Sequence, residues 1–154
     1  MTEKFKDVKN YLKQIRYLRN SIAQKKAELE ELRATAADIK ATAYNNTAVK
    51  KSRRDTDALY VNRLMRIDAL ERRIEEEIVC SSEKKHEILS MILCMQNGIY
   101  SQILTMHYVE LKSFEDISEE TGYSYQYVIN LHRKAIAALG EIYIREMIDI
   151  EKSA

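Results

Sequence analysis

The sequence contains no proline and only three glycines among its 154 residues, so residues that interrupt regular structure are nearly missing. Charged residues are abundant, at 32% of the chain. A charge-rich chain with so few helix breakers is typical of proteins built from long helices. The composition therefore predicts an all-α protein, with either one domain and an extension or one small domain and a coiled coil.

Long apolar runs are missing as well, and this bears on where the protein works. No stretch is apolar and long enough to span a bilayer, and the N-terminus shows no signal-peptide pattern. We therefore expect a cytoplasmic protein with no membrane partner.

Residues suited to catalysis or metal binding do not cluster in the sequence. Cys80 and Cys94 match no zinc-binding spacing, and the histidines His86, His107 and His132 are scattered. No glycine-rich phosphate loop and no nucleophile motif occurs. The sequence predicts a protein that is not an enzyme and has no cofactor or metal site, with both cysteines as reduced thiols.

The C-terminal third of the chain carries the signals of two helices joined by a tight turn. Ser113, with Asp116 three residues later, is typical of a helix start. Gly122 is typical of the end of that short helix. Ser124 is then placed to cap a further helix that begins at Tyr125. This order of signals predicts a helix-turn-helix.

The helix predicted after Ser124 has two different faces. Apolar residues recur on one face every three or four positions and are expected to pack inward: Val128, Leu131, Ala135, Ile136 and Leu139. The opposite face carries side chains that can contact base edges in the major groove: Tyr125, Gln126, Ile129, Asn130 and Arg133. Phosphate contacts are predicted for Lys112, Ser124 and Lys134. Since any amphipathic helix has a polar face, the prediction depends on the caps and the turn.

The segment ILTMHYVELKSFEDISEETGYSYQYVINLHRKAIAAL resembles region four of bacterial sigma factors, which reads a promoter element. The shared pattern is HYVE, then LKSFEDIS, GYS and V-x-x-L-H-x-x-A-x-x-x-L. Nearly the whole chain also resembles small phage and prophage regulators of late transcription of the ArpU kind. The resemblance implies DNA binding, with Tyr125, Gln126, Ile129 and Asn130 at base-reading positions and Ser124 at the helix cap. Tyr125 and Ile129 stand where sigma factors often have arginine, which implies a different target.

The charge distribution leaves two functions open. Residues 97–154 contain 5 Lys and Arg and 9 Asp and Glu, a net charge of −4 in a chain whose net charge is +1. Because contacts between basic side chains and phosphates supply most non-specific affinity, DNA binding by this segment would need help. The alternative is an interaction module that docks on RNA polymerase or another phage protein without reading DNA. Nothing specific supports a structural role in the virion.

An apolar heptad repeat over residues 8–39, with Lys25 as its exception, predicts one long helix. A second helix follows, with an apolar stripe formed by Tyr60, Leu64, Ile67, Ile74, Ile78, Ile88, Ile92 and Met95. Two such helices most simply fold back as an antiparallel hairpin. Pairing between two copies of the chain, as a homodimer, is the alternative.

The remaining expectations concern boundaries. We predict a hairpin or coiled coil over 1–96, with a loop near 41–56, a helix-turn-helix over 97–140 and an apolar helical tail over 141–154. The tail either docks on the chain's own hairpin or forms a dimer or partner interface. Within the loop lies a basic cluster that is either simply solvated or an arm for the DNA backbone: Lys50, Lys51, Arg53 and Arg54. Ser81 and Ser82 are candidates for a helix cap that would kink or split the second long helix.

Overall fold

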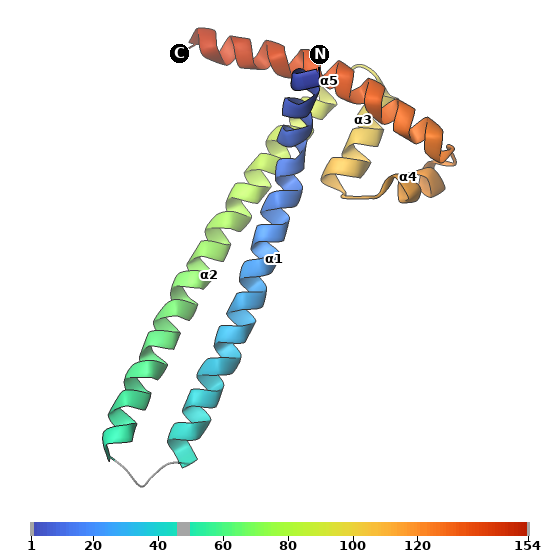
Figure 1. Ribbon diagram of the computed structural model, residues 1–154. Coiled ribbons are helices and arrows are strands. Elements are labelled where there is room, and N and C mark those ends of the chain that lie inside the picture. The colour runs from blue at the N-terminus through green and yellow to red at the C-terminus, as the bar shows by residue number, and fades with distance from the viewer. Residues whose placement is uncertain (1, 46–49, 154) are drawn as a thin grey trace. The chain divides into compact units, whose positions relative to one another are not determined.

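The computed structural model describes residues 2–45 and 50–153, and all regular structure within these ranges is helical. The elements are α1 (Thr2–Asn45), α2 (Lys50–Leu93), α3 (Gly98–Leu104), the π-helical segment η1 (Thr105–Val109), α4 (Phe114–Thr121) and α5 (Tyr125–Ser153) (Figure 1). The prediction of an all-α protein is thus confirmed for the described ranges. None of these helices is both long and apolar enough to cross a membrane.

The two long helices extend further than the sequence suggested. α1 continues to Asn45 and α2 begins at Lys50, so helix occupies much of the range 41–56 where a loop was expected. This range contains no glycine or proline and is rich in alanine, lysine and arginine, which favour helix. Residues 46–49 of the expected loop lie outside the described residues, as do the side chains of the basic cluster that follows.

α2 also passes Ser81 and Ser82 without a break. A serine caps a helix only where the backbone leaves the helical conformation, and the surrounding sequence contains no residue that enforces such a departure. The real interruption comes later, where Asn97 caps α3 by accepting hydrogen bonds from the backbone N–H groups of Ile99 and Tyr100. The expectation of a split second helix was therefore wrong.

Two compact units can be distinguished by their internal contacts. Unit 1 consists of Met1–Tyr17 together with Ser81–Ala154, and unit 2 consists of Leu18–Cys80. α1 and α2 each contribute to both units. Unit 1 therefore combines the segments predicted as helix-turn-helix and tail with the first turns of α1 and the end of α2.

Unit 2 is an antiparallel pair of helices. Lys25 Nζ lies 2.5 Å from Glu77 Oε1, and Arg33 Nη2 lies 2.7 Å from Glu71 Oε1, so later residues of α1 pair with earlier residues of α2 (Figure 1). Lys25, the exception in the heptad repeat, is thus paired rather than left in an apolar seam. The seam itself buries Leu29, Leu32, Ala36 and Ile74. The stripe predicted on α2 is only partly covered, since Leu64 and Ile78 are exposed.

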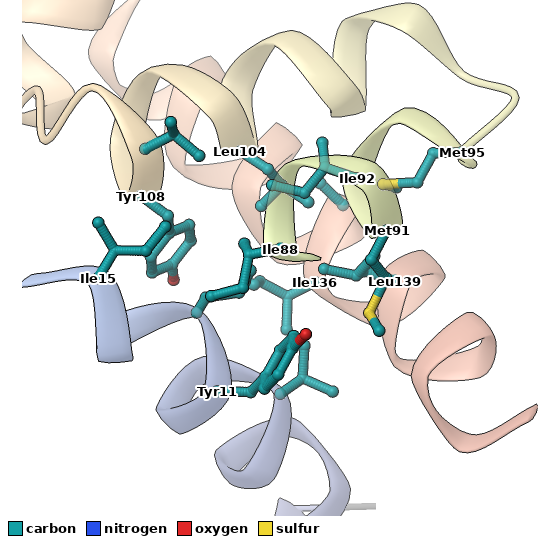
Figure 2. Close-up of a cluster of buried hydrophobic side chains, with 14 residues drawn as sticks. Tyr11, Ile15, Ile88, Met91, Ile92, Met95, Leu104, Tyr108, Ile136 and Leu139 are labelled. Atoms are coloured by element: carbon teal, nitrogen blue, oxygen red, sulfur yellow. The ribbon is translucent and has the colours of Figure 1, made fainter. Parts of the chain in front are cut away.

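Unit 1 has a core built from several helices. Its larger cluster joins side chains of α1, α2, α3, η1 and α5, among them Tyr11, Ile88, Tyr108 and Ile136 (Figure 2). A smaller cluster connects α3, η1, α4 and α5: Ile103, Met106, Ile117, Val128 and Leu131. The residues predicted for the inner face of the last helix are all buried: Val128, Leu131, Ala135, Ile136 and Leu139. This part of the inner-face prediction is confirmed.

The C-terminal tail is a direct continuation of α5. Ile142 and Tyr143 pack against the larger cluster of unit 1, and the Tyr143 ring centroid lies 5.1 Å from that of Tyr11. From Arg145 to Ser153 the helix is exposed, including Met147, Ile148 and Ile150. The first part of the tail thus docks on its own chain, as one of the two alternatives predicted.

Candidate functional site

Local capping interactions define both helices at the α4–α5 corner. At the start of α4, Ser113 Oγ accepts a hydrogen bond from the Asp116 N–H (3.1 Å), and Asp116 Oδ2 accepts one from the Ser113 N–H (3.4 Å). Gly122 ends α4 with a φ of 75°, a conformation that glycine adopts without the usual steric cost. Ser124 Oγ then accepts from the Tyr127 N–H (3.2 Å) at the start of α5. All three predicted boundary signals are confirmed.

The turn between the helices is held by two further interactions. Ser118 Oγ donates to the Tyr123 carbonyl oxygen at 2.5 Å, and the Tyr123 ring packs edge-on against that of Tyr127 at 5.2 Å between centroids. Ile117 of α4 and Val128 of α5, both completely buried, meet in the smaller cluster. The angle at which α5 leaves the corner is therefore set by packing as well as by caps.

One face of the first four turns of α5 remains open. The exposed residues that form it are Tyr125, Gln126, Asn130, Arg133 and Lys134, and Ser124 at the cap and the neighbouring Tyr127 are exposed as well. Gln126 Nε2 lies 3.5 Å from Asn130 Oδ1, so the two amides lie next to each other. Ile129 is half-buried at the edge of this face. We call this surface the α5 face.

Lys112 differs from the other predicted contact residues because its charge is already paired. Its Nζ lies 2.8 Å from Glu110 Oε2 and 2.7 Å from Glu120 Oε2. These two carboxylates raise the pKa of Lys112 above its ordinary value. A phosphate contact by Lys112 would therefore replace existing ion pairs.

A cluster of aromatic and imidazole rings that the sequence did not reveal braces the corner from inside. The His107 ring stacks on Phe114 with centroids 4.2 Å apart, and His107 Nδ1 lies 2.8 Å from the Lys112 carbonyl oxygen. His132 Nε2 and Tyr108 Oη are hydrogen-bonded at 2.7 Å. The two histidines are far apart in sequence and follow no shared period, so only the fold brings them together.

The electrostatics of these rings point to a structural role. Burial lowers the pKa of His132 to about 4 and also lowers the pKa of His107, while burial raises the pKa of Tyr108 to about 12. All three side chains are therefore neutral near pH 7. Among the described residues, no three or more His, Cys, Asp and Glu side chains gather in a way that could hold a metal ion. We interpret the cluster as a neutral brace between η1, α4 and α5.

The connection from η1 to α4 has unusual backbone geometry. The Glu110 N–H bonds to the Thr105 carbonyl oxygen (2.9 Å) across five residues, which is the π-helical pattern. Leu111 then has a φ of 58°, and the Lys112 N–H bonds back to the Met106 carbonyl oxygen (2.9 Å). This is the arrangement in which glycine usually ends a helix, here formed by leucine. It turns the chain sharply toward Ser113.

The first turns of α1 lie beside the α4–α5 corner. Lys9 and Phe5 line a groove together with residues of α5, including Ile129, Arg133 and Lys134. Arg16 lines a second groove with Ser113 and Tyr125. A third groove, with His107 and Leu111, is bordered by Lys13 and again by Arg16. No sequence pattern indicates this juxtaposition, because it depends on contacts between distant parts of the chain.

The fold and this site define a helical protein in which a long antiparallel hairpin is combined with a capped two-helix corner. Residues 38–140 match the model of a family described as "Protein of unknown function (DUF1492)", and the chain belongs to that family. The matched range begins near the end of α1 and includes the corner and the α5 face. No curated protein and no solved structure matches the chain.

Proposed function

We propose that the protein is a sequence-specific DNA-binding regulator of transcription, and that α4 and α5 act as a helix-turn-helix of the sigma-region-four kind. One observation carries this proposal. The start of α5 presents an open face of amide, guanidinium and phenol groups, whereas its opposite face is fixed in the core by Val128 and Leu131. A helix held from behind in this way can enter the major groove with its N-terminal turns.

The side chains of the α5 face suit base recognition. Gln126 and Asn130 can each make two hydrogen bonds to an adenine, and Arg133 can do so to a guanine. Tyr125 lies beside them, and Ile129 at the edge can contact a thymine methyl group. Ser124 and Lys134 are placed for phosphate contacts, and Lys112 joins them only by leaving its two carboxylates.

The proposal that the protein regulates phage or prophage genes rests on its sequence resemblance to phage regulators, because the matched family has no known function. The chain resembles phage and prophage regulators of late transcription, and the pattern from HYVE to the end of the predicted recognition helix resembles sigma region four. We therefore assign the protein to control of phage or prophage genes, in a cytoplasmic setting where RNA polymerase is a potential partner.

Selection of bound sequences from a random duplex pool at low salt is the direct test. The expected result is an enriched motif, and a palindrome within it would indicate a symmetric dimer, because operator symmetry mirrors protein symmetry. Low salt is needed because basic contacts on this surface are few. No enrichment with protein shown to be folded and helical by circular dichroism would overturn the proposal.

Two substitutions then test the assigned face. Asn130→Ala and Arg133→Ala are each expected to reduce the free energy of specific binding by roughly 1–3 kcal/mol, because each removes a base contact. Arg145→Ala, on an exposed part of the same helix outside the α5 face, is the matched control. Wild-type affinity in both variants, with the helix content unchanged, would contradict the assignment of these residues.

One observation favours a different function, an interaction module that docks on RNA polymerase without reading DNA. Lys112 is held between Glu110 and Glu120, so this side of the corner has acidic groups where a DNA-binding protein needs basic ones. This function predicts no retention of DNA at low salt and retention of purified RNA polymerase on the immobilised protein. If the protein is instead a sequence-specific regulator, the immobilised protein should retain DNA at low salt and enrich particular sequences.

A further inference from the structure

We propose that Lys9, Lys13 and Arg16 of α1 form a second contact surface for the DNA backbone, which we call the α1 stripe. This inference rests on the proposed function, since it assigns to α1 the phosphate contacts that the α4–α5 corner lacks. The stripe is part of unit 1, as are α4 and α5. Its ligand is the phosphate backbone of the same duplex that the α5 face reads.

Helical geometry places the three side chains together. They follow each other at intervals of four and three residues, so they lie on one face of α1 and span about 10 Å along its axis. All three are exposed. Within residues 2–45 and 50–153 the structure records no ion pair for any of them, in contrast to Lys112. Their charges are thus available to a ligand.

The two ends of the α1 stripe border the α5 face. Lys9 shares a groove with Ile129, at the edge of the α5 face, and with Arg133. Arg16 shares another groove with Tyr125 at the start of α5. A duplex whose major groove received the α5 face would therefore have its flanking backbone next to α1. Two acidic residues, Glu115 and Asp116, also line the groove of Arg16, so we expect Arg16 to contribute least of the three.

The charge balance agrees with this assignment. Residues 1–17 contain five Lys and Arg and two Asp and Glu, a net charge of +3, against −4 for residues 97–154. The two acids, Glu3 and Asp7, lie on a different side of α1 from the stripe, because of their helical spacing. A duplex held on unit 1 would therefore meet basic groups mainly on α1. The α1 stripe would thus provide the positive charge for phosphate contacts that the acidic C-terminal segment lacks.

The test is the salt dependence of DNA binding by a triple variant, Lys9→Gln with Lys13→Gln and Arg16→Gln. Glutamine retains much of each aliphatic stem and favours helix, so the substitutions mainly remove charge. Affinity is measured from low to moderate salt on the selected sequence and on an unrelated duplex. The slope of log K against log salt is negative, and we expect its magnitude to decrease by about 0.9 for each phosphate that is no longer neutralised, on both duplexes, with sequence preference retained.

A second triple variant controls for overall charge. Lys26→Gln, Lys40→Gln and Arg66→Gln remove the same charge from exposed positions of unit 2. This control is expected to keep the wild-type slope. An equal decrease in the magnitude of the slope for both triple variants would overturn the inference, because it would trace the effect to net charge.

The experiments distinguish an error in the α1-stripe assignment from an error in the proposed DNA-binding function. If wild-type protein enriches a motif and the α1-stripe variant keeps its slope, the stripe assignment is wrong while the α5 face stands. If wild-type protein retains no DNA at low salt, both are wrong. Normal DNA binding together with loss of RNA polymerase retention in the stripe variant would make the stripe a protein-docking surface, and would also overturn the inference.

Discussion

Units 1 and 2 achieve stability in different ways. In unit 1 several side chains from different helices are completely buried, including Leu12, Ile92 and Leu104. In unit 2 the most buried described hydrophobic residue, Ala36, still has 5% of its surface exposed, and ion pairs such as that between Lys25 and Glu77 cross the seam. Two helices alone can cover only one stripe of each other, whereas five helical segments can enclose a core.

Glycine, which interrupts helices, and histidine, which supplies the buried polar rings, are also concentrated in unit 1. All three glycines and all three histidines lie in unit 1, and residues 18–80 contain neither type. Unit 1 therefore has turns, caps and buried polar rings that fix the direction of the α5 face. Unit 2 repeats one local geometry, and its exposed surface can change with little effect on the pairing. Precise placement of side chains is thus expected in unit 1.

The largest expected effect tests this difference in burial. Leu104→Ala in unit 1 should lower the free energy of unfolding by about 2–5 kcal/mol, because it leaves a cavity in an enclosed core. Leu29→Ala in unit 2, which removes the same atoms from a seam that is open to water, should cost less. Denaturant unfolding followed by circular dichroism measures both. A larger loss of stability for Leu29→Ala would contradict the contrast between the two units.

The second prediction concerns pH and unit 1 alone. His132 has a pKa of about 4 in the folded protein against 6.5 for an unperturbed histidine, so the unfolded chain binds a proton first as pH falls. Stability from this group is complete above pH 6.5 and is lost progressively down to pH 4, by on the order of 3 kcal/mol. Hydrogen exchange should show that the free energy of opening unit 1 falls between pH 6.5 and pH 4, whereas that of unit 2, which contains no histidine, changes less.

Two variants isolate the contribution of His132. His132→Gln removes the titrating ring and should flatten the fall in stability between pH 6.5 and 4, even though it weakens the brace with Tyr108 at neutral pH. His86→Gln, at an exposed position of unit 1, should leave the fall unchanged. The same pH dependence in both variants would assign the acid sensitivity to other groups.

A smaller effect is expected at the caps. Ser113→Ala should cost about 1 kcal/mol, because the Asp116 N–H loses its acceptor Ser113 Oγ, while the bond from the backbone N–H of residue 113 to Asp116 Oδ2 can still form. Ser82→Ala, in the middle of α2, should be neutral or slightly stabilising, because alanine is the best helix former. Thermal unfolding of the two variants side by side gives the answer. An equal loss in both would show that the cap contributes nothing.

The smallest effects should have opposite signs. Gly122→Ala places a Cβ on a residue with a φ of 75° and should destabilise the protein by roughly 1 kcal/mol. Gly140→Ala lies within α5, where the added Cβ would meet Val8 Cγ2 at an ordinary 3.7 Å, and should stabilise by roughly 0.5–1 kcal/mol. The denaturant midpoints of the two variants, compared with that of the wild-type protein, measure both changes. A stabilising Gly122→Ala would contradict the left-handed turn after α4.

The corner was predictable because its signals are local. Ser113, Gly122 and Ser124 act on backbone groups within a few residues, so sequence spacing alone indicates the caps. The inner face of α5 was predictable for a similar reason, since helical periodicity marks which residues share a side. The assignment of the opposite face to DNA stays a prediction.

Other features could not be read from local patterns. The brace between His107 and His132, and the position of Lys9 beside Arg133, depend on how distant segments pack. The left-handed backbone at Leu111 was also missed, because the residue type gives no hint of a positive φ. The length of α1 and α2 was underestimated since polar residues without glycine or proline do not by themselves end a helix.

The continuity of α5 from Tyr125 to Ser153 has a mechanical consequence. At 1.5 Å per residue the helix is a rod of about 43 Å, and it contains no proline or π-helical turn at which it could bend. The exposed apolar residues Met147 and Ile150 and the side chains near Tyr125 therefore lie at opposite ends of one straight helix. A partner that binds the C-terminal end of α5 would therefore also constrain the orientation of its N-terminal turns toward a ligand.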